Sequence, residues 1–155
     1  MYMDRNTPEI GGKGIYCLIL RNTACSMNVG RCGKIDFEAG YHIYVGSALG
    51  PGGLKRLNRH IRVAQEGNIS KAHWHIDYLL THPAFDLISV IYARSSERME
   101  CLLAERIGAE NVPGFGCSDC NCRSHLFYRR SNPVEEIEKA FSDIFSFAPV
   151  TIENF

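Results

Sequence analysis

Long apolar runs and short alternating segments predict the strands of this chain. Residues 14–20 form an almost continuous apolar run, which is typical of a central strand buried on both faces. In residues 41–45, the side chains of Tyr41, Ile43 and Val45 alternate with those of more polar neighbours. Connections between the first strands are too short for a crossover helix, so the sheet is expected to be mainly antiparallel. The other predicted strands are residues 26–29, 34–37, 87–92 and 125–130.

Apolar residues that recur every three or four positions predict helices between the strands. Leu54, Leu57 and Ile61 fall on one face of the first helix, and Gly67 follows its end. The predicted helices are residues 53–65, 71–80 and 133–145, and a segment that Ser95 or Ser96 caps and that ends near Ile107. The expected fold is therefore an α/β (α+β) domain, with a small, mainly antiparallel sheet flanked by helices.

Length and composition are those of one globular domain. The chain has 155 residues, 45% of them hydrophobic, and no apolar run reaches the roughly 20 residues of a membrane span. The polar residues 1–12 are unlike a signal peptide and predict a flexible leader. We expect a single domain at 13–146, a C-terminal tail at 147–155 and a cytoplasmic location.

Charge is balanced over the whole chain and concentrated locally. Seventeen basic and 17 acidic residues give a net charge of zero, which argues against a protein whose entire surface binds nucleic acid. One predicted helix is nevertheless strongly basic, which indicates a small basic cleft on a neutral body. Its basic residues are Lys55, Arg56, Arg59, His60 and Arg62.

The seven cysteines are an odd number without a secretion signal, so a disulfide scaffold is not expected. Cys17 and Cys101 are expected to be buried thiols. A group of three cysteines and one histidine is spaced closely enough to bind one structural zinc ion. The alternative is that these thiols are free and close a loop over a site. The group is Cys117, Cys120, Cys122 and His125.

The glycine-rich segment 46–53 links the strand at 41–45 to the basic helix. A helix N-terminus with free N–H groups binds anions, and Arg56, one turn inside, would add a planar donor group for a phosphate. The alternative interpretation is an ordinary surface loop followed by a solvated basic helix face.

Three short motifs lie along the chain: Gly14-Ile15-Tyr16, then Tyr44-Val45-Gly46, then Lys55 and Arg56 followed by His60. Together they resemble the GIY-YIG nuclease superfamily. Further segments, at 46–54, 74–79 and 114–120, look like its Uri-type branch of small prokaryotic proteins. The resemblance covers residues 14–128. The matching residues are Gly14, Ile15 and Tyr16, then Tyr44, Val45 and Gly46, then Lys55, Arg56 and His60.

This resemblance implies a metal-dependent endonuclease that hydrolyses phosphodiester bonds in nucleic acid, with DNA preferred to RNA. Tyr16 would hydrogen-bond or deprotonate the attacking water, and Tyr44 would assist it. Arg56 would stabilise the scissile phosphate, and His60 would orient it or move a proton. In the family a helical Glu binds a single divalent metal, Mg²⁺ or Mn²⁺, and Glu105 is the match. Its competitors are Glu100, which is the strongest, Glu97 and Glu110.

The two phenols raise a question of ionisation. A free phenol has a pKa of about 10, so it is a poor base at neutral pH. A positive neighbour such as Arg56, or a metal ion, would favour the phenolate. The alternative is that Tyr16 and Tyr44 are ordinary amphipathic residues of a sheet.

Further residues are predicted to contact the substrate. Trp74 would stack on a base, although a core position is the competing interpretation. A polar group on the second side of the site would come from Ser118, Asp119, Asn121 or His125. The full predicted substrate-binding set is Gly46, Ser47, Lys55, Arg59, Trp74, His75, Ser118 and His125.

Two other functions remain open from the sequence. The neutral net charge and the unusual cysteine-rich loop also fit a non-catalytic nucleic-acid-binding module with a degenerate nuclease cleft. A zinc-stabilised interaction domain would rest on the cysteine and histidine group alone.

Overall fold

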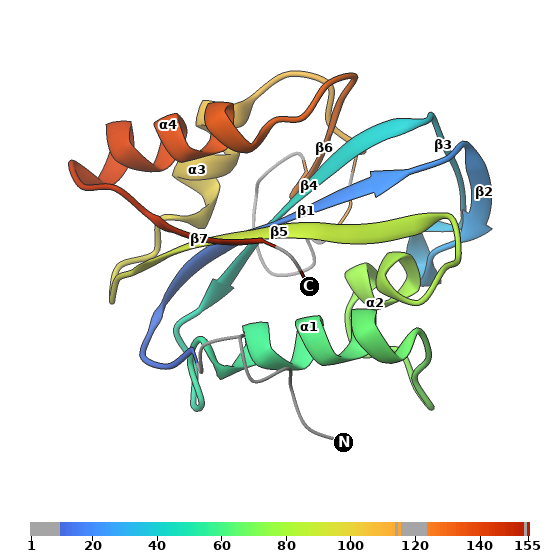
Figure 1. Cartoon of the computed structure of the whole chain (residues 1–155), viewed down its shortest axis with the longest axis horizontal. Helices are drawn as coiled ribbons and strands as arrows, with labels where there is room; N and C mark the ends of the chain where they lie inside the picture. Colours follow the sequence, from blue (N-terminus) through green and yellow to red (C-terminus); the bar gives the residue numbers. More distant parts are fainter. Residues whose placement is uncertain (1–9, 114, 116–123, 154) are drawn as a thin grey trace.

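The computed structural model describes residues 10–113, 115, 124–153 and 155. Within them the chain forms an α+β domain around a five-stranded antiparallel sheet, which confirms the predicted fold class. The strand order is β6-β4-β1-β5-β7, so β1 is central (Figure 1). The strands are β1 (Gly14–Asn22), β4 (Gly40–Ala48), β5 (Phe85–Arg94), β6 (Leu126–Arg129) and β7 (Val150–Glu153).

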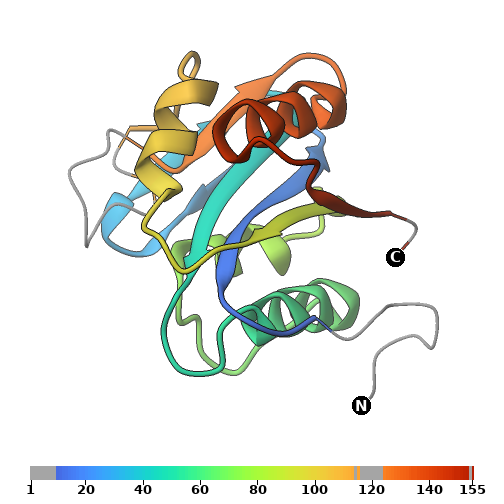
Figure 2. The same cartoon turned by 90° about the vertical axis from the view of Figure 1, so that its left-hand side faces the viewer.

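Helices cover both faces of this sheet. α1 (Lys55–Glu66) and α2 (His75–Leu80) lie on one face, and α3 (Glu100–Ile107) and α4 (Val134–Phe145) lie on the other (Figure 1). The view at right angles shows the same separation, with α3 and α4 above the sheet and α1 below it (Figure 2). The domain therefore has two hydrophobic cores, one on each face.

The central position of β1 explains its continuous apolar run. Successive side chains of a strand point to opposite faces of the sheet. Tyr16 and Leu18 belong to the core beneath α1 and α2, whereas Cys17 and Ile19 belong to the core beneath α3 and α4. Both sets are buried, which explains why charged and amide side chains occur only at the end of β1, at Arg21 and Asn22.

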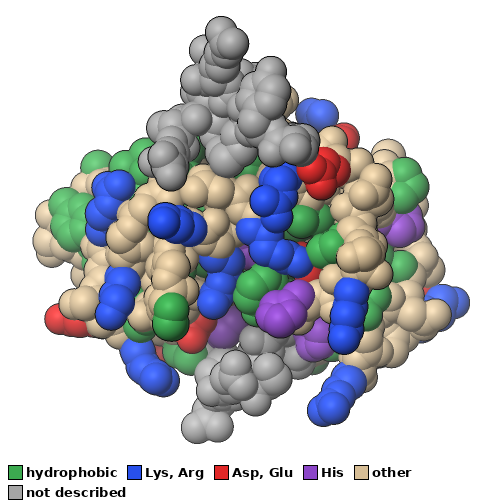
Figure 3. Space-filling model, turned by 90° about the horizontal axis from the view of Figure 1, so that it is seen from below, with side chains coloured by type: hydrophobic (Ala, Val, Ile, Leu, Met, Phe, Trp, Pro, Cys, Tyr) green, Lys and Arg blue, Asp and Glu red, His purple; other side chains and the backbone are tan. Residues whose placement is uncertain are grey.

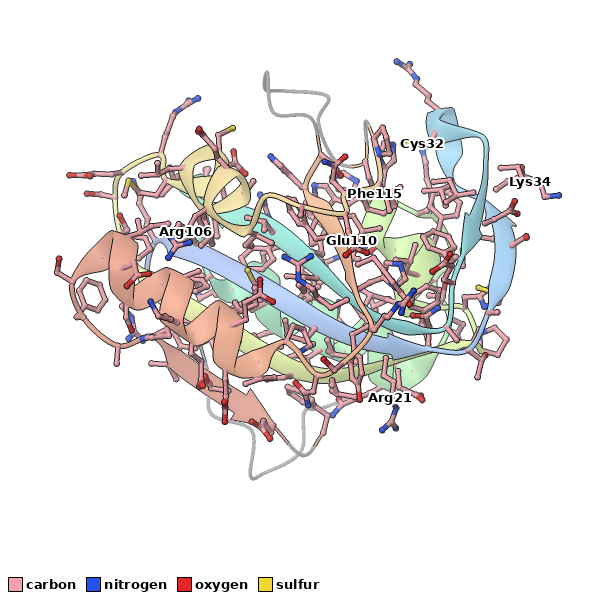
Figure 4. All side chains as sticks on the ribbon, turned by 90° about the horizontal axis from the view of Figure 1, so that it is seen from above. Arg21, Cys32, Lys34, Arg106, Glu110 and Phe115 are labelled. Carbon is pink, nitrogen blue, oxygen red and sulfur yellow. The ribbon has the colours of Figure 1, made fainter. Side chains whose placement is uncertain are left out.

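A small hairpin projects from the sheet. β2 (Cys25–Asn28) and β3 (Lys34–Phe37) form a separate two-stranded sheet, joined through the 3-10 turn η1 (Gly30–Cys32). Cys32 and Lys34 mark this hairpin at one side of the molecule (Figure 4). The Sγ atom of Cys32 lies 3.5 Å from Nδ1 of His75, so the hairpin contacts the start of α2.

Two helices begin later than predicted. α2 starts at His75 rather than near 71, because the Asp77 carboxylate accepts the backbone N–H groups of His73 and Trp74. Trp74 is extended, with φ −122° and ψ 158°. α3 starts at Glu100. Both changes move cavity-facing residues to the first turn of a helix.

Both terminal segments contribute to the domain. The predicted tail at 147–155 includes β7, which pairs with β5. Ile10, in the predicted leader, is fully buried, and its carbonyl accepts a hydrogen bond from Asn58. The domain therefore extends beyond the predicted limits of 13 and 146. No helix in the described part of the chain is long and apolar enough to cross a membrane.

Candidate functional site

A cavity of about 500 Å³ opens beside the ends of β1 and β4. It brings together segments that are far apart in the sequence. Its lining residues are Tyr16, Tyr44, Val45, Gly46, Ser47, Leu49, Gly50, Arg56, His73, Trp74, His75, Arg98, Glu100 and His125.

The pairing of β1 with β4 places the two phenols side by side. Tyr16 lies opposite Gly46 and Leu18 lies opposite Tyr44, so the two tyrosines are diagonal neighbours on one face. Their ring centroids are 6.5 Å apart. A Cβ atom at Gly46 would collide with the Tyr16 ring, so only glycine leaves room for this phenol. This explains why glycine ends the motif Tyr44-Val45-Gly46.

Tyr16 and His60 form a buried pair. The Tyr16 hydroxyl lies 3.0 Å from Nε2 of His60, and the two residues are 1% exposed. Burial lowers the pKa of His60 to about 3, so its imidazole is neutral. Its Nδ1 atom has no hydrogen-bond partner among the described residues. Buried N–H groups without partners are rarer than bare acceptors, so we assign the proton to Nε2, which donates to the Tyr16 oxygen. The Tyr16 proton is then free to point into the cavity.

Both phenols are held in the neutral form. Burial raises the pKa of Tyr16 well above its ordinary value of 10, and the charge of Arg56 offsets only part of this effect. Burial likewise raises the pKa of Tyr44. Arg56 does favour the phenolate, as expected, because its charge and hydrogen bond lower the pKa of Tyr16, but desolvation outweighs the attraction of this one cation.

Arg56 is positioned by two contacts at the mouth of the cavity. It donates a hydrogen bond of 2.6 Å to the carbonyl of Ser47. Its guanidinium lies 4.8 Å from the centre of the Trp74 ring. Together these contacts restrict a long side chain, while the remaining N–H groups of its planar guanidinium are available to an anion.

An ion pair between Arg59 and the buried Asp77 lies next to the Trp74 ring that contacts Arg56. Arg59 donates to both oxygens of Asp77, at 2.9 and 3.0 Å, and Asp77 is fully buried. Burial raises the pKa of Asp77, but hydrogen bonds from Arg59 and two backbone N–H groups outweigh burial and lower it overall. The Arg59 guanidinium also lies 4.7 Å from the Trp74 ring.

Trp74 therefore supports side chains instead of offering an open stacking surface. It is half-buried, and its ring is contacted by Arg56, Arg59, His60 and His73. Cation–π contact holds both guanidinium groups against the indole ring. The predicted stacking of Trp74 on a base is not the role these contacts favour.

Glu100, and not Glu105, faces the cavity. Glu100 lines it with a side chain that is 29% exposed, and its Oε2 atom lies 3.9 Å from Nδ1 of His125. Glu105 is exposed on α3 and does not line the cavity. Five residues along a helix rotate a side chain by about 140° beyond a full turn, so both cannot point the same way. The prediction that Glu105 joins the site is therefore wrong.

The other predicted site residues divide into three groups. Gly46, Ser47, His75 and His125 line the cavity. Lys55 is exposed outside it, and Arg59 is engaged by Asp77. Cys117, Ser118, Asp119, Cys120, Asn121 and Cys122 lie outside the described residues, so the predicted zinc group is not placed. In the described part of the chain, no three His, Cys, Asp or Glu side chains are grouped to hold a metal ion.

Cys101, expected to be a buried thiol, is half-buried and disulfide-bonded.

The start of α1 does not form the expected anion site. The N–H groups of Leu54, Lys55 and Arg56 donate to the carbonyls of Gly12, Gly52 and Gly53, respectively. These donors are already satisfied, so a phosphate here would be bound by side chains. The basic helix still shapes the surface: Lys and Arg side chains gather across the face of α1 and α2, with His side chains beside them (Figure 3).

Two residues that line the cavity, and one that packs beside it, were not anticipated. Arg98 precedes α3, and its side chain lines the cavity. His73 lines it too. Phe115, labelled in Figure 4, packs against Tyr44 and His75 with ring centroids 6.1 and 5.5 Å away. No local sequence signal identifies these residues, because each reaches the cavity through the tertiary fold.

Comparison with known proteins places the chain in a family. A family model described as "Domain of unknown function DUF123" matches residues 15–146. A search of curated proteins found no match, and neither did a search of solved structures. The matched segment includes every residue that lines the cavity. Because the match spans most of the chain, the protein belongs to the DUF123 family.

Proposed function

We propose that this protein is a metal-dependent endonuclease that hydrolyses phosphodiester bonds in nucleic acid, with DNA preferred, in the cytoplasm. One observation carries the proposal. Tyr16, Tyr44, Arg56 and Glu100 come from four separate segments and line a single cavity. Two hydroxyl donors, one fixed cation and one carboxylate are the groups that phosphoryl transfer to water requires.

Arg56 would bind the scissile phosphate. Its guanidinium is fixed by Ser47 and Trp74 before any substrate arrives. Such preorganisation stabilises charge that develops on the phosphate oxygens without further rearrangement. Arg98 enters the same cavity from the loop before α3, so it would add a second positive charge.

Glu100 would hold the divalent cation. A partly exposed carboxylate beside a cavity of about 500 Å³ fits Mg²⁺ or Mn²⁺, which bind through few protein ligands and keep open positions. When bound, such a cation supplies a Lewis acid that lowers the pKa of water towards neutrality. The neutral phenols do not have to act as bases in this scheme. Tyr16, held by His60, and Tyr44 would donate hydrogen bonds that orient the attacking water and the phosphate.

A matched pair of carboxylate variants tests the proposal. Purified protein is incubated with plasmid, single-stranded and branched DNA in Mg²⁺ or Mn²⁺, and the cleaved fraction is followed over time. We expect Glu100→Gln and Arg56→Gln to slow cleavage by about 100-fold or more, because each removes a group that stabilises the transition state. Glu105→Gln, on the same helix but outside the cavity, and Arg62→Gln, on the exposed side of α1, serve as controls. Equal cleavage rates in all four variants would refute the assignment.

A second function is favoured by one observation. Both phenols are buried and neutral, so neither tyrosine is a ready base when no cation is present. A nucleic-acid-binding module without turnover fits that state. Binding that weakens as salt rises, with no cleavage in either metal, would identify it.

A further inference from the structure

We propose that His125 and Glu100 together bind one divalent transition-metal ion, so that the site prefers Mn²⁺ and similar ions to Mg²⁺. The inference refines the cation site of the proposed nuclease. It adds a nitrogen ligand that neither the sequence motifs nor the single-carboxylate scheme requires.

The distance between the two side chains suits a shared ion. Nδ1 of His125 lies 3.9 Å from Oε2 of Glu100. That separation is too long for a direct hydrogen bond, which spans about 2.7–3.2 Å. It is shorter than the roughly 4.2 Å between two ligand atoms on opposite sides of one ion at about 2.1 Å each. An ion between them would therefore contact both.

His125 is held rigidly in place. Its backbone N–H donates to the carbonyl of Phe115 at 2.9 Å, and its carbonyl accepts the N–H of Val45 at 2.8 Å. The second bond ties it directly to the residue after Tyr44. Its side chain is only 4% exposed, so the imidazole cannot swing away from the cavity. Metal ligands need this kind of fixed orientation.

Glu100 would be the second ligand of the ion. It is the first residue of α3, and its side chain is 29% exposed. Both residues line the cavity of about 500 Å³, which leaves space for waters or a phosphate oxygen to complete the coordination.

The donor pair determines the choice of metal. Mg²⁺ prefers oxygen ligands and gives up its waters reluctantly. Imidazole nitrogen suits Mn²⁺, Co²⁺, Zn²⁺ and related ions, and carboxylate suits Mn²⁺ as well. A carboxylate and an imidazole on one ion therefore shift the selectivity of the site towards transition metals.

The decisive measurement uses the full unmodified chain without nucleic acid. Metal-free protein is titrated with Mn²⁺, and pulsed EPR then detects ¹⁴N modulation from a nitrogen bound to the ion. We expect one site per chain with clear ¹⁴N modulation, and Mn²⁺ affinity at least about tenfold above that for Mg²⁺. Absence of ¹⁴N modulation would overturn the inference whatever the behaviour of any variant.

Variants assign the signal to this pair. His125→Ala is expected to abolish the modulation, and Glu100→Gln to weaken Mn²⁺ binding by about tenfold or more, with circular dichroism checking that both fold. His73→Ala, another histidine of the cavity, is the control and should change neither. Unchanged Mn²⁺ affinity in Glu100→Gln would refute the shared site and leave His125 in some other role, such as an ion pair with the carboxylate.

This inference and the proposed nuclease can fail separately. If the protein binds Mn²⁺ through a nitrogen ligand but cleaves no DNA, the metal site is supported and the nuclease function is refuted. Cleavage that needs Glu100 but shows no bound nitrogen would retain the nuclease and reject the role of His125.

Discussion

At the scale of single residues, close contacts decide what each group can do. Tyr16 is fully buried, faces the backbone of Gly46 and shares a hydrogen bond with His60. Arg56 is fixed by a carbonyl and an indole ring. The identities of these residues are visible in the sequence, but their protonation states follow from burial, which the sequence does not display.

A substitution at Gly46 tests the close packing of the phenol. Gly46→Ala would place a methyl group inside the Tyr16 ring, so the phenol or the strand must shift. We expect a loss of about 1–3 kcal/mol in the free energy of unfolding, measured by urea denaturation, from overpacking. Cleavage should fall as well. Gly50→Ala, where a Cβ meets nothing within 4 Å, is the control. Equal stability of the two variants would contradict the assigned packing.

At the scale of secondary structure, periodicity and register place the site. The strands and helices follow their apolar patterns, and most of them lie close to the predicted ranges. The starts of α2 and α3 do not, because Asp77 satisfies backbone N–H groups before α2 and residues 95–98 stay outside α3. The later start of α3 brings Glu100 into its first turn, facing the cavity.

The last strand offers a test at this scale. β7 pairs with β5, and Thr151 donates a 2.6 Å hydrogen bond to Glu138 of α4. Removing residues 150–155 should therefore lower the free energy of unfolding by about 1–3 kcal/mol, since it uncovers the edge of β5. Thermal unfolding followed by circular dichroism measures this. Removal of a flexible tail would not change the melting temperature. An unchanged melting temperature would therefore show that β7 adds no stability.

At the scale of the whole molecule, a sheet covered on both faces buries several titratable groups. His42 is 2% exposed and binds Asn22 at 2.8 Å, and burial lowers its pKa to about 4. His60 is also buried and neutral. Folding thus keeps at least two imidazoles uncharged at a pH where the unfolded chain would protonate them.

This burial predicts a pH dependence of stability. In the unfolded chain both histidines take up protons below about pH 6.5, whereas in the folded protein the pKa values of His42 and His60 are about 4 and about 3. The free energy of unfolding should therefore be unaffected by these groups above pH 6.5. It should fall between pH 6.5 and pH 4, by about 3 kcal/mol for each histidine at most. Urea denaturation at pH 7.5, 6.5, 5.5 and 4.5 measures it. His42→Gln should flatten the curve, and a wild-type curve without slope below pH 6.5 would contradict the assigned burial.

The sequence by itself determined the helices and the strands other than β7, because apolar periodicity depends only on neighbouring residues. Its resemblance to the nuclease motifs singled out Tyr16, Tyr44 and Arg56, which line the cavity. Five predicted substrate-binding residues also line it: Gly46, Ser47, Trp74, His75 and His125. Only the tertiary structure decided that Glu100 faces the cavity instead of Glu105, that Arg98 and His73 join it, and that both phenols stay neutral. It also showed that the N–H groups at the start of α1 are already bonded. The physical reason is that helix rotation, desolvation and hydrogen-bond satisfaction depend on what packs around a residue, and those neighbours come from distant parts of the chain.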